Sequence, residues 1–289
     1  MSEIRIKIST LKTLFHTQLS PLYEKQEIDA IFFIYINYNY NIKKYQYFLN
    51  PHHEILFFKN DLEALTKGKP IQYLTGTTTF CKLSLNVNPS VLIPRPETEE
   101  LVTMILEREK EKAKSSKQKV EILDLATGSG AIAIALAKNI ENTEVWATDI
   151  SKEALDTAKK NAEDCNVNIT FLHHDILRDG ITLLPDNLDI IVSNPPYIPD
   201  GERTQLHKNV IDYEPDNALF VPDENPLIFY HAIAKIAKKL LRKGGVLYFE
   251  TFEKFHSELS AMLAKLGFKE IELWNDLNGK PRFVTCKKL

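Results

Sequence analysis

The chain has 289 residues, of which 44% are hydrophobic and 26% are charged, a balance that suits one large or two ordinary soluble domains and argues against extended disorder. With 36 Lys and Arg against 39 Asp and Glu, the net charge of −3 creates no strong basic field of the kind that attracts nucleic acid. The three cysteines form no C-x-x-C pair, which argues against a disulfide framework or a zinc site and favours a reducing cytoplasm.

Residues 1–75 are predicted to form a small helical domain, because their apolar residues, such as Ile8, Leu11 and Phe15, recur at helical spacing. The most apolar stretch of this part, residues 30–36, is much shorter than the roughly 18 residues that a membrane span needs. Residues 76–93 alternate and are rich in Thr, Val and Leu, which predicts a β-hairpin that joins two domains. A helix is then expected from about Pro96, with acidic residues in its first turn.

From residue 119 onward, short apolar strands alternate with helical segments, a pattern typical of a parallel sheet wrapped by helices. The last two strands, within residues 268–274 and 282–288, are joined by a turn too short for a helix. They are therefore predicted to form an antiparallel hairpin at the edge of the sheet.

A turn of small residues follows the first strand of this alternation, and consists of Ala126, Thr127, Gly128, Ser129 and Gly130. Small residues at a strand-to-helix turn let the backbone approach a ligand closely, and open α/β sheets bind ligands at these carboxyl ends. Close packing between helix and strand would also explain the glycines. The spacing differs from G-x-G-x-x-G, so a dinucleotide pyrophosphate is the poorer fit.

Acidic residues end the next two strands. Asp149 follows the small-residue turn by about 20 residues, where a carboxylate accepts hydrogen bonds from both ribose hydroxyls. Asp175 is placed to accept a hydrogen bond from an adenine amino group, with Ile176 packed on the ring, although a helix N-cap would explain Asp175 equally well. Together with the small-residue turn, these residues predict a nucleoside cofactor.

The fourth strand ends in N-P-P-Y, residues 194–197. Pro195 and Pro196 lack a backbone N–H and hold Asn194 in an extended or turn conformation. Asn194 and Pro195 then offer two carbonyl acceptors and Tyr197 an aromatic face, a set that suits a planar NH2 group aimed at an electrophile. A simple turn with a buried tyrosine is the alternative, but the strand is expected beside the cofactor strand, which favours the functional interpretation.

These motifs resemble those of class I S-adenosylmethionine-dependent methyltransferases, and more narrowly those of the peptide chain release factor glutamine N5-methyltransferase family. The resemblance covers most of the chain and includes, besides residues 123–133 and N-P-P-Y, the stretches at residues 68–76, 91–102, 213–219 and 276–282. N-P-P-Y is shared by several methyltransferase families, whereas I-P-R-P-E-T-E, residues 93–99, is specific to this one.

The resemblance implies an α/β fold with a Rossmann-like, mostly parallel seven-stranded sheet and a C-terminal antiparallel hairpin. It assigns substrate recognition to residues 1–75, the linking hairpin to 76–93 and the catalytic domain to 94–289. It also implies methyl transfer from S-adenosyl-L-methionine, which leaves as S-adenosyl-L-homocysteine, to the glutamine of the Gly-Gly-Gln motif in class 1 release factors. The expected partners are these release factors, with no direct nucleic acid and no membrane, and the expected protein is a cytoplasmic monomer.

By the same resemblance, residues 126–130, Asp149, Asp175, Ile176 and Asn194 hold the cofactor, and residues 194–197 hold the target amide, with Asn194, Pro195 and Tyr197 catalytic. Arg95 and Glu97 lie where the family has a loop that covers the cofactor, although a helix start would explain Glu97 equally well. Glu250, at the end of the fifth strand, either lines the crevice or makes a structural hydrogen bond.

The sequence departs from the family pattern in two places. Ala126 stands where glycine is usual, so the turn must accept a Cβ near the cofactor. Residues 220–226 replace a glycine-containing loop. The neighbouring histidine pairs at 52–53 and 173–174 lack metal-site spacing, so no metal is expected.

Two other functions stay open at this point. The first is methylation of an exocyclic amine of adenine or guanine in nucleic acid, since N-P-P-Y does not distinguish that NH2 group from an amide. The second is a protein that binds the cofactor without catalysis. The net charge argues against the first, and intact Asn194 and Tyr197 argue against the second.

Overall fold

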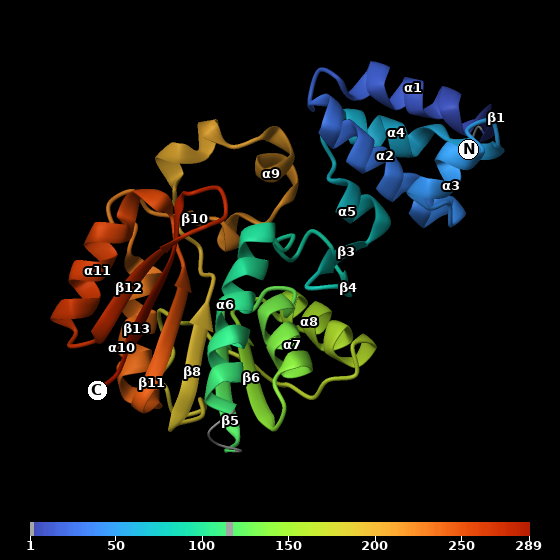
Figure 1. Ribbon diagram of the computed structural model, residues 1–289. Helices are drawn as coiled ribbons and strands as arrows, with labels where there is room; N and C mark the ends of the chain where they lie inside the picture. The colour runs from blue at the N-terminus through green and yellow to red at the C-terminus, as the bar shows by residue number, and fades with distance from the viewer. Residues whose placement is uncertain (1–2, 114–117) are drawn as a thin grey trace. The chain divides into compact units, whose positions relative to one another are not determined.

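The computed structural model describes residues 3–113 and 118–289 (Figure 1). The chain forms two compact units. The smaller unit runs to Thr77 and includes the distant segment His207–Tyr213, and the larger unit consists of Thr78–Leu206 and Glu214–Leu289. Among the described residues, no helix combines the length and the apolar character required to cross a membrane.

The smaller unit is helical, as predicted, around a core that includes the fully buried side chains of Leu11, Phe15, Phe32 and Tyr35. Its helices are α1 (Ile8–Leu19), α2 (Lys25–Tyr40), α3 (Lys44–Leu49), α4 (Lys59–Thr66), α5 (Ile71–Thr75) and α9 (Lys208–Tyr213). The sequence analysis missed a pair of antiparallel strands, β1 (Glu3–Lys7) and β2 (Glu54–Phe58). Each has only five residues, and its partner lies about 50 residues away, so local patterning gave little signal.

Side-chain contacts join the segment His207–Tyr213 to the rest of the smaller unit. The His207 ring donates a hydrogen bond from Nε2 to the carbonyl of Leu22 at 2.9 Å. The same ring stacks on Tyr23, with 5.4 Å between the ring centroids.

The predicted hairpin after the helical part is formed by β3 (Thr77–Phe80) and β4 (Leu83–Asn86). Two left-handed residues, Cys81 and Lys82, make its tight turn.

The larger unit contains a seven-stranded sheet in the order β12-β13-β11-β8-β5-β6-β7. All neighbouring pairs are parallel except those of β13, which runs antiparallel to β11 and to β12. This arrangement confirms the predicted sheet with its C-terminal hairpin at the edge. The strands are β5 (Val120–Leu125), β6 (Thr143–Asp149), β7 (Thr170–His173), β8 (Leu188–Ser193), β11 (Leu241–Glu250), β12 (Lys269–Asn275) and β13 (Pro281–Lys287).

Helices cover both faces of this sheet (Figure 1). On one face, α6 (Pro96–Ala113) and α7 (Ala131–Asn139) pack on residues such as Ile122 and Ile190. On the other face, α10 (Ile228–Leu240) and α11 (His256–Lys265) pack on residues such as Leu123 and Ile191. Because neighbouring residues of one strand face opposite sides, each strand contributes to both cores and reads as a continuous apolar run.

One further helix and several short elements complete the larger unit. They are α8 (Lys152–Asp164), the parallel strands β9 (Ile198–Pro199) and β10 (Phe220–Val221), and the 3-10 helices η1 (Asp200–Gln205), η2 (Asp216–Ala218) and η3 (Glu253–Phe255).

The register of the sheet brings the ends of the parallel strands to one edge. Ser193 of β8 pairs with Leu125 of β5 on one side and with Phe249 of β11 on the other. Leu125 in turn pairs with Thr148 of β6. The residues that directly follow these positions in the chain are therefore neighbours, although their sequence numbers differ by up to about 125.

Candidate functional site

A cavity of about 650 Å³ opens at the carboxyl edge of the sheet, within the larger unit. Its volume lies in the range that is typical of small-molecule sites. Its walls come from the loops that follow the parallel strands, from the start of α6 and from the segment around β10. The lining residues include 126–129, 149–151, 174–178, Asn194, Pro196, Arg95 and Thr98, with further contributions from within residues 90–94 and 217–229.

The small-residue turn connects β5 to α7, and its residues 126–129 line the cavity. Its conformation is left-handed at three positions, with φ of +60° at Ala126, +55° at Gly128 and +80° at Gly130. Gly130 does not line the cavity. A Cβ at Gly130 would lie 3.1 Å from the Cβ of Ala158, so this glycine allows close packing against α8. Close packing therefore explains Gly130, whereas Gly128 lines the cavity, and its approach to a ligand stays a prediction.

The buried carboxyl group of Asp124 is hydrogen-bonded to the turn. Asp124 is fully buried and accepts a hydrogen bond from the hydroxyl of Thr127 at 2.6 Å. Burial raises the pKa of Asp124 to about 7. The backbone N–H of Thr127 also donates to the carbonyl of Thr148, which ties the turn to β6.

Asp149 lines the cavity at the end of β6. Its Oδ2 accepts a hydrogen bond from the N–H of Gly128, and its Oδ1 accepts one from the N–H of Ser151, both at 2.9 Å. Burial raises the pKa of Asp149, while these two N–H groups oppose the rise. Each carboxylate oxygen has a second acceptor site, so Asp149 keeps the capacity to bind hydroxyl groups of a ligand.

Asp175 and Ile176 line the same cavity after β7. Asp175 accepts a hydrogen bond from the N–H of Leu177 at 2.9 Å, but it heads a turn and no helix begins there, so the helix N-cap alternative is wrong. The neighbouring His174, which the sequence analysis considered only as a metal ligand, also lines the cavity. Its side chain is 4% exposed, and its Nε2 atom has no hydrogen-bond partner among the residues that the structure describes.

The segment N-P-P-Y leaves β8 beside the small-residue turn. Asn194 and Pro196 line the cavity, whereas Pro195 and Tyr197 do not. The ring of Tyr197 stacks on Phe252, with 6.1 Å between the centroids. After the two prolines, the N–H groups of Tyr197 and Ile198 both donate to the carbonyl of Leu219. These hydrogen bonds fix the backbone at the end of N-P-P-Y.

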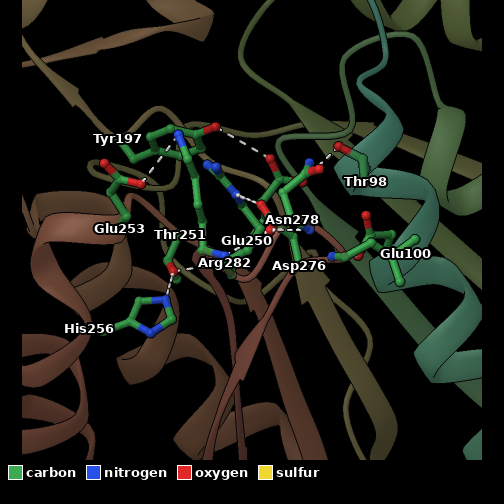
Figure 2. A network of polar contacts seen from close by, with 12 residues as sticks. Thr98, Glu100, Tyr197, Glu250, Thr251, Glu253, His256, Asp276, Asn278 and Arg282 are labelled. Atoms are coloured by element: carbon green, nitrogen blue, oxygen red, sulfur yellow. Dashed lines mark hydrogen bonds and ion pairs between the residues drawn. The ribbon is translucent and has the colours of Figure 1, made fainter.

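The side chains of Asn194 and Tyr197 both belong to a buried polar network. Figure 2 shows the part of it around Thr98, Tyr197 and Glu250. Asn194 donates from Nδ2 to the hydroxyl of Thr98 at 3.3 Å. Thr98 donates to Oε2 of Glu250 at 2.7 Å, and the hydroxyl of Tyr197 donates to Oε1 of Glu250 at 3.3 Å. Burial and the neighbouring Glu250 raise the pKa of Tyr197, so its phenol stays protonated as a donor.

Arg282, the second residue of β13, places a positive charge close to this network, and the loop before it carries Asp276. Asp276 accepts hydrogen bonds from the N–H groups of Asn278 and Lys280, and its carboxylate lies 3.4 Å from Nε of Arg282. Burial raises the pKa of Glu250, and the positive charge of Arg282 opposes this rise. The N–H of Leu277 donates to Glu100, which ties the loop to α6.

Arg95 lines the cavity and forms an ion pair with Glu214 at 2.6 Å. Glu214 is 5% exposed and also accepts a hydrogen bond from the N–H of Ile93. Glu97 lies in the first turn of α6, outside the cavity. The structure therefore separates the two residues that were considered together for a cofactor loop.

The arrangement fits a nucleoside-containing cofactor. The turn exposes backbone at Gly128, the Asp149 carboxylate offers acceptors for hydroxyl groups, and Ile176 adds an apolar wall. The sequence analysis missed Thr98, His174 and Glu214, because their significance depends on contacts between distant segments. Within the described residues, no three or more His, Cys, Asp or Glu side chains come together in a group suited to a metal ion.

Comparisons with known proteins were made for the sequence and for the fold. The family model described as "Methyltransferase small domain" matches residues 103–216. A Flavobacterium psychrophilum protein named release factor glutamine methyltransferase is 41% identical over 282 residues, which cover 96% of this chain and 98% of that protein. A protein of the same name from Bacteroides thetaiotaomicron is 42% identical over 231 residues, which cover 80% of each chain.

Among solved structures, a methyltransferase from Pyrococcus furiosus superposes with a TM-score of 0.52. The match covers 80% of this chain and 99% of that one, at 18% sequence identity. At this identity the likeness concerns the fold alone, and it agrees with the predicted class I methyltransferase fold.

Proposed function

The chain belongs to the release factor glutamine methyltransferase family, and we propose that it methylates the side-chain amide nitrogen, N5, of the glutamine in the Gly-Gly-Gln motif of class 1 peptide chain release factors. The observation that carries the proposal is the shared cavity: Asn194 lines it together with Asp149 and the small-residue turn. S-adenosyl-L-methionine supplies an electrophilic methyl group there and leaves as S-adenosyl-L-homocysteine.

In this proposal residues 126–129 of the turn, Asp149, Asp175 and Ile176 hold the cofactor, whereas Gly130 packs against α8. Asp149 accepts hydrogen bonds from the ribose hydroxyls, and Ile176 packs on the adenine. Arg95, which faces the same cavity, is held in place by the buried Glu214.

In this proposal the target amide is held by two acceptors, the side-chain oxygen of Asn194 and the backbone carbonyl of Pro195. Pro195 is not itself a lining residue, but it lies between Asn194 and Pro196, which both line the cavity. An amide nitrogen is a weak nucleophile because its lone pair is delocalised, and acceptors that draw on its two hydrogens make that pair more available. In the reaction a nitrogen–carbon bond forms, the sulfur–methyl bond breaks, and one N–H proton passes to solvent. Orientation and polarisation therefore account for the catalysis without a strong base.

Methylation of an exocyclic amine in nucleic acid is not favoured, because the similar curated proteins are named for glutamine methylation of release factors. The three cysteines are free thiols, which fits the proposed location in the cytoplasm.

The function is tested by offering labelled S-adenosyl-L-methionine together with a class 1 release factor and RNA. We expect label on the release factor and none when its Gly-Gly-Gln glutamine is replaced. Label on the RNA, or on neither substrate, would contradict the proposal.

The role of Asn194 is tested with the variant Asn194→Ala. We expect kcat to fall by about 100-fold or more, because one of two acceptors for the target amide is lost. Cofactor affinity, measured by calorimetry, should change much less. Asn168→Ala is the matched control, because Asn168 is an exposed asparagine that precedes β7 at the opposite edge of the sheet. Unchanged turnover in Asn194→Ala would remove the role of Asn194.

A further inference from the structure

The polar network behind Asn194 sets the direction of each of its hydrogen bonds. Glu250 is the last residue of β11, is 1% exposed, and has both carboxylate oxygens engaged by hydroxyl groups. Thr98, in the first turn of α6, is 4% exposed and lies between Glu250 and Asn194. Figure 2 shows Thr98 and Tyr197 converging on Glu250.

A threonine hydroxyl has a single hydrogen to donate, and an ionised carboxylate only accepts. The 2.7 Å contact with Glu250 therefore uses the hydrogen of Thr98, and leaves lone pairs of that oxygen for its other neighbour. That neighbour is the Asn194 amide, which donates from Nδ2 at 3.3 Å. An asparagine in the opposite orientation would place its carbonyl oxygen against the lone pairs of Thr98, which is repulsive.

We propose that Thr98 is a positioning residue that, supported by Glu250, fixes the side-chain amide of Asn194 with Oδ1 available to the target nitrogen. The inference rests on the proposed function, because the orientation matters only if Oδ1 accepts a hydrogen bond from the substrate. It gives a new role to the threonine of I-P-R-P-E-T-E, which lines the cavity and acts on the reaction through its hydrogen bond with Asn194.

The same carboxylate also positions the second side chain of N-P-P-Y. The Tyr197 hydroxyl donates to Oε1 of Glu250, while Thr98 uses Oε2. Glu250 thus acts as a common anchor for Asn194 and Tyr197, and the positive charge of Arg282 opposes the rise in the pKa of Glu250 that burial causes.

A purely structural role of the buried Thr98 makes a different prediction from a positioning role. If Thr98 only fills space, activity should follow stability in every variant. If Thr98 positions Asn194, activity should follow the presence of the hydroxyl, because a small misalignment at a reacting group costs up to about 100-fold in rate.

The test compares Thr98→Val, which keeps the shape and removes the hydroxyl, with Thr98→Ser, which keeps the hydroxyl and removes a methyl group. We expect kcat to fall by about 10- to 100-fold in Thr98→Val and to stay within about 3-fold of wild type in Thr98→Ser. The dissociation constant of S-adenosyl-L-homocysteine should change by less than about 3-fold in both, since Thr98 acts on the target amide. Thr103→Val is the matched control, because this threonine of α6 is exposed and its hydroxyl donates to the carbonyl of Glu99, in the same helix.

Glu250→Gln provides an independent arm of the experiment. A glutamine side chain at residue 250 has one acceptor oxygen where the carboxylate has two, so it accepts from only one of the hydroxyls of Thr98 and Tyr197 and turns its NH2 group to the other. When the NH2 group faces Thr98, the threonine hydrogen becomes available to Asn194 and favours the reversed amide. We expect kcat to fall by about 10-fold or more, with the same small change in cofactor affinity.

The outcomes separate the two proposals. If the wild-type protein does not methylate the release factor, the proposed function fails. If the wild type is active and Thr98→Val keeps kcat within about 2-fold, or Thr98→Ser loses as much activity as Thr98→Val, only the positioning role fails. Should Thr98→Val not fold, Thr98→Ser and Thr98→Ala make the same comparison, because both lack the methyl group and only serine keeps the hydroxyl.

Discussion

Ala126, which lines the cavity, has a strained backbone conformation. Ala126 occupies the left-handed region, with φ of +60°, at a position where the family usually has glycine. A left-handed conformation costs a residue with a Cβ roughly 1–2 kcal/mol. The turn is therefore kept in place by its surroundings, including the hydrogen bonds from Thr127 to Thr148 and to Asp124.

The variant Ala126→Gly should consequently be more stable than the wild type. Relief of the strain exceeds the entropy that a glycine adds to the unfolded chain, so we expect a gain of about 1 kcal/mol and a rise in Tm of about 2–4 °C. Thermal unfolding followed by circular dichroism measures the change. Ala137→Gly, in α7, is the control and should have the opposite effect; a lower Tm in Ala126→Gly would contradict the strain.

At the scale of elements, the junction of β5, the small-residue turn and α7 shows that glycines in one motif have different tasks. Gly128 lines the cavity, and a Cβ there would meet no atom within 4 Å. Gly130 is the N-cap of α7, and a Cβ there would lie 3.0 Å from Cδ1 of Ile134 and 3.1 Å from Cβ of Ala158. Gly128 is thus part of the cavity surface, whereas Gly130 allows α7 to pack against α8.

Alanine substitutions should separate these tasks. Gly130→Ala combines left-handed strain with overpacking, and we expect it to destabilise the protein by about 2–4 kcal/mol. Gly128→Ala carries only the backbone strain, which we expect to cost about 1–2 kcal/mol. Urea denaturation of the two variants measures the difference, and equal losses would show that Ala158 and Ile134 adjust to a Cβ at residue 130.

At the scale of the whole molecule, the two compact units differ in what they contribute. All residues that line the cavity belong to the larger unit. The smaller unit includes His207–Tyr213, so the chain leaves the larger unit after the N-P-P-Y tip and returns to it at Glu214, the partner of Arg95. The role of the smaller unit in recognising the release factor stays a prediction.

Cofactor binding should therefore stabilise one unit only. A ligand at 100 times its dissociation constant adds about 2.7 kcal/mol, which for a unit of this size raises Tm by about 5–10 °C. In scanning calorimetry we expect S-adenosyl-L-homocysteine to shift the unfolding of the larger unit and to leave that of the smaller unit in place. Asp149→Ala should abolish the shift, whereas an unchanged shift in this variant would argue against the role of Asp149.

The sequence by itself determined the fold class and the edge of the sheet where the cavity lies. Alternating strands and helices specify a parallel sheet, and the turn after β5, Asp149 after β6 and Asn194 after β8 must then meet at its carboxyl edge. These are local patterns, since strand, turn and helix signals lie within a few residues of one another.

Only the tertiary structure decided how Asn194 is oriented and which residues support it. Thr98 lies 96 residues from Asn194 and 152 residues from Glu250 along the chain, and the hydrogen bonds that join them have no period and no composition to reveal them. For the same reason, the sequence analysis did not predict the short strands β1 and β2. It also did not predict that His207–Tyr213 belongs to the smaller unit. Contacts of this kind exist only after the chain has folded, because burial and strand register bring their distant partners together.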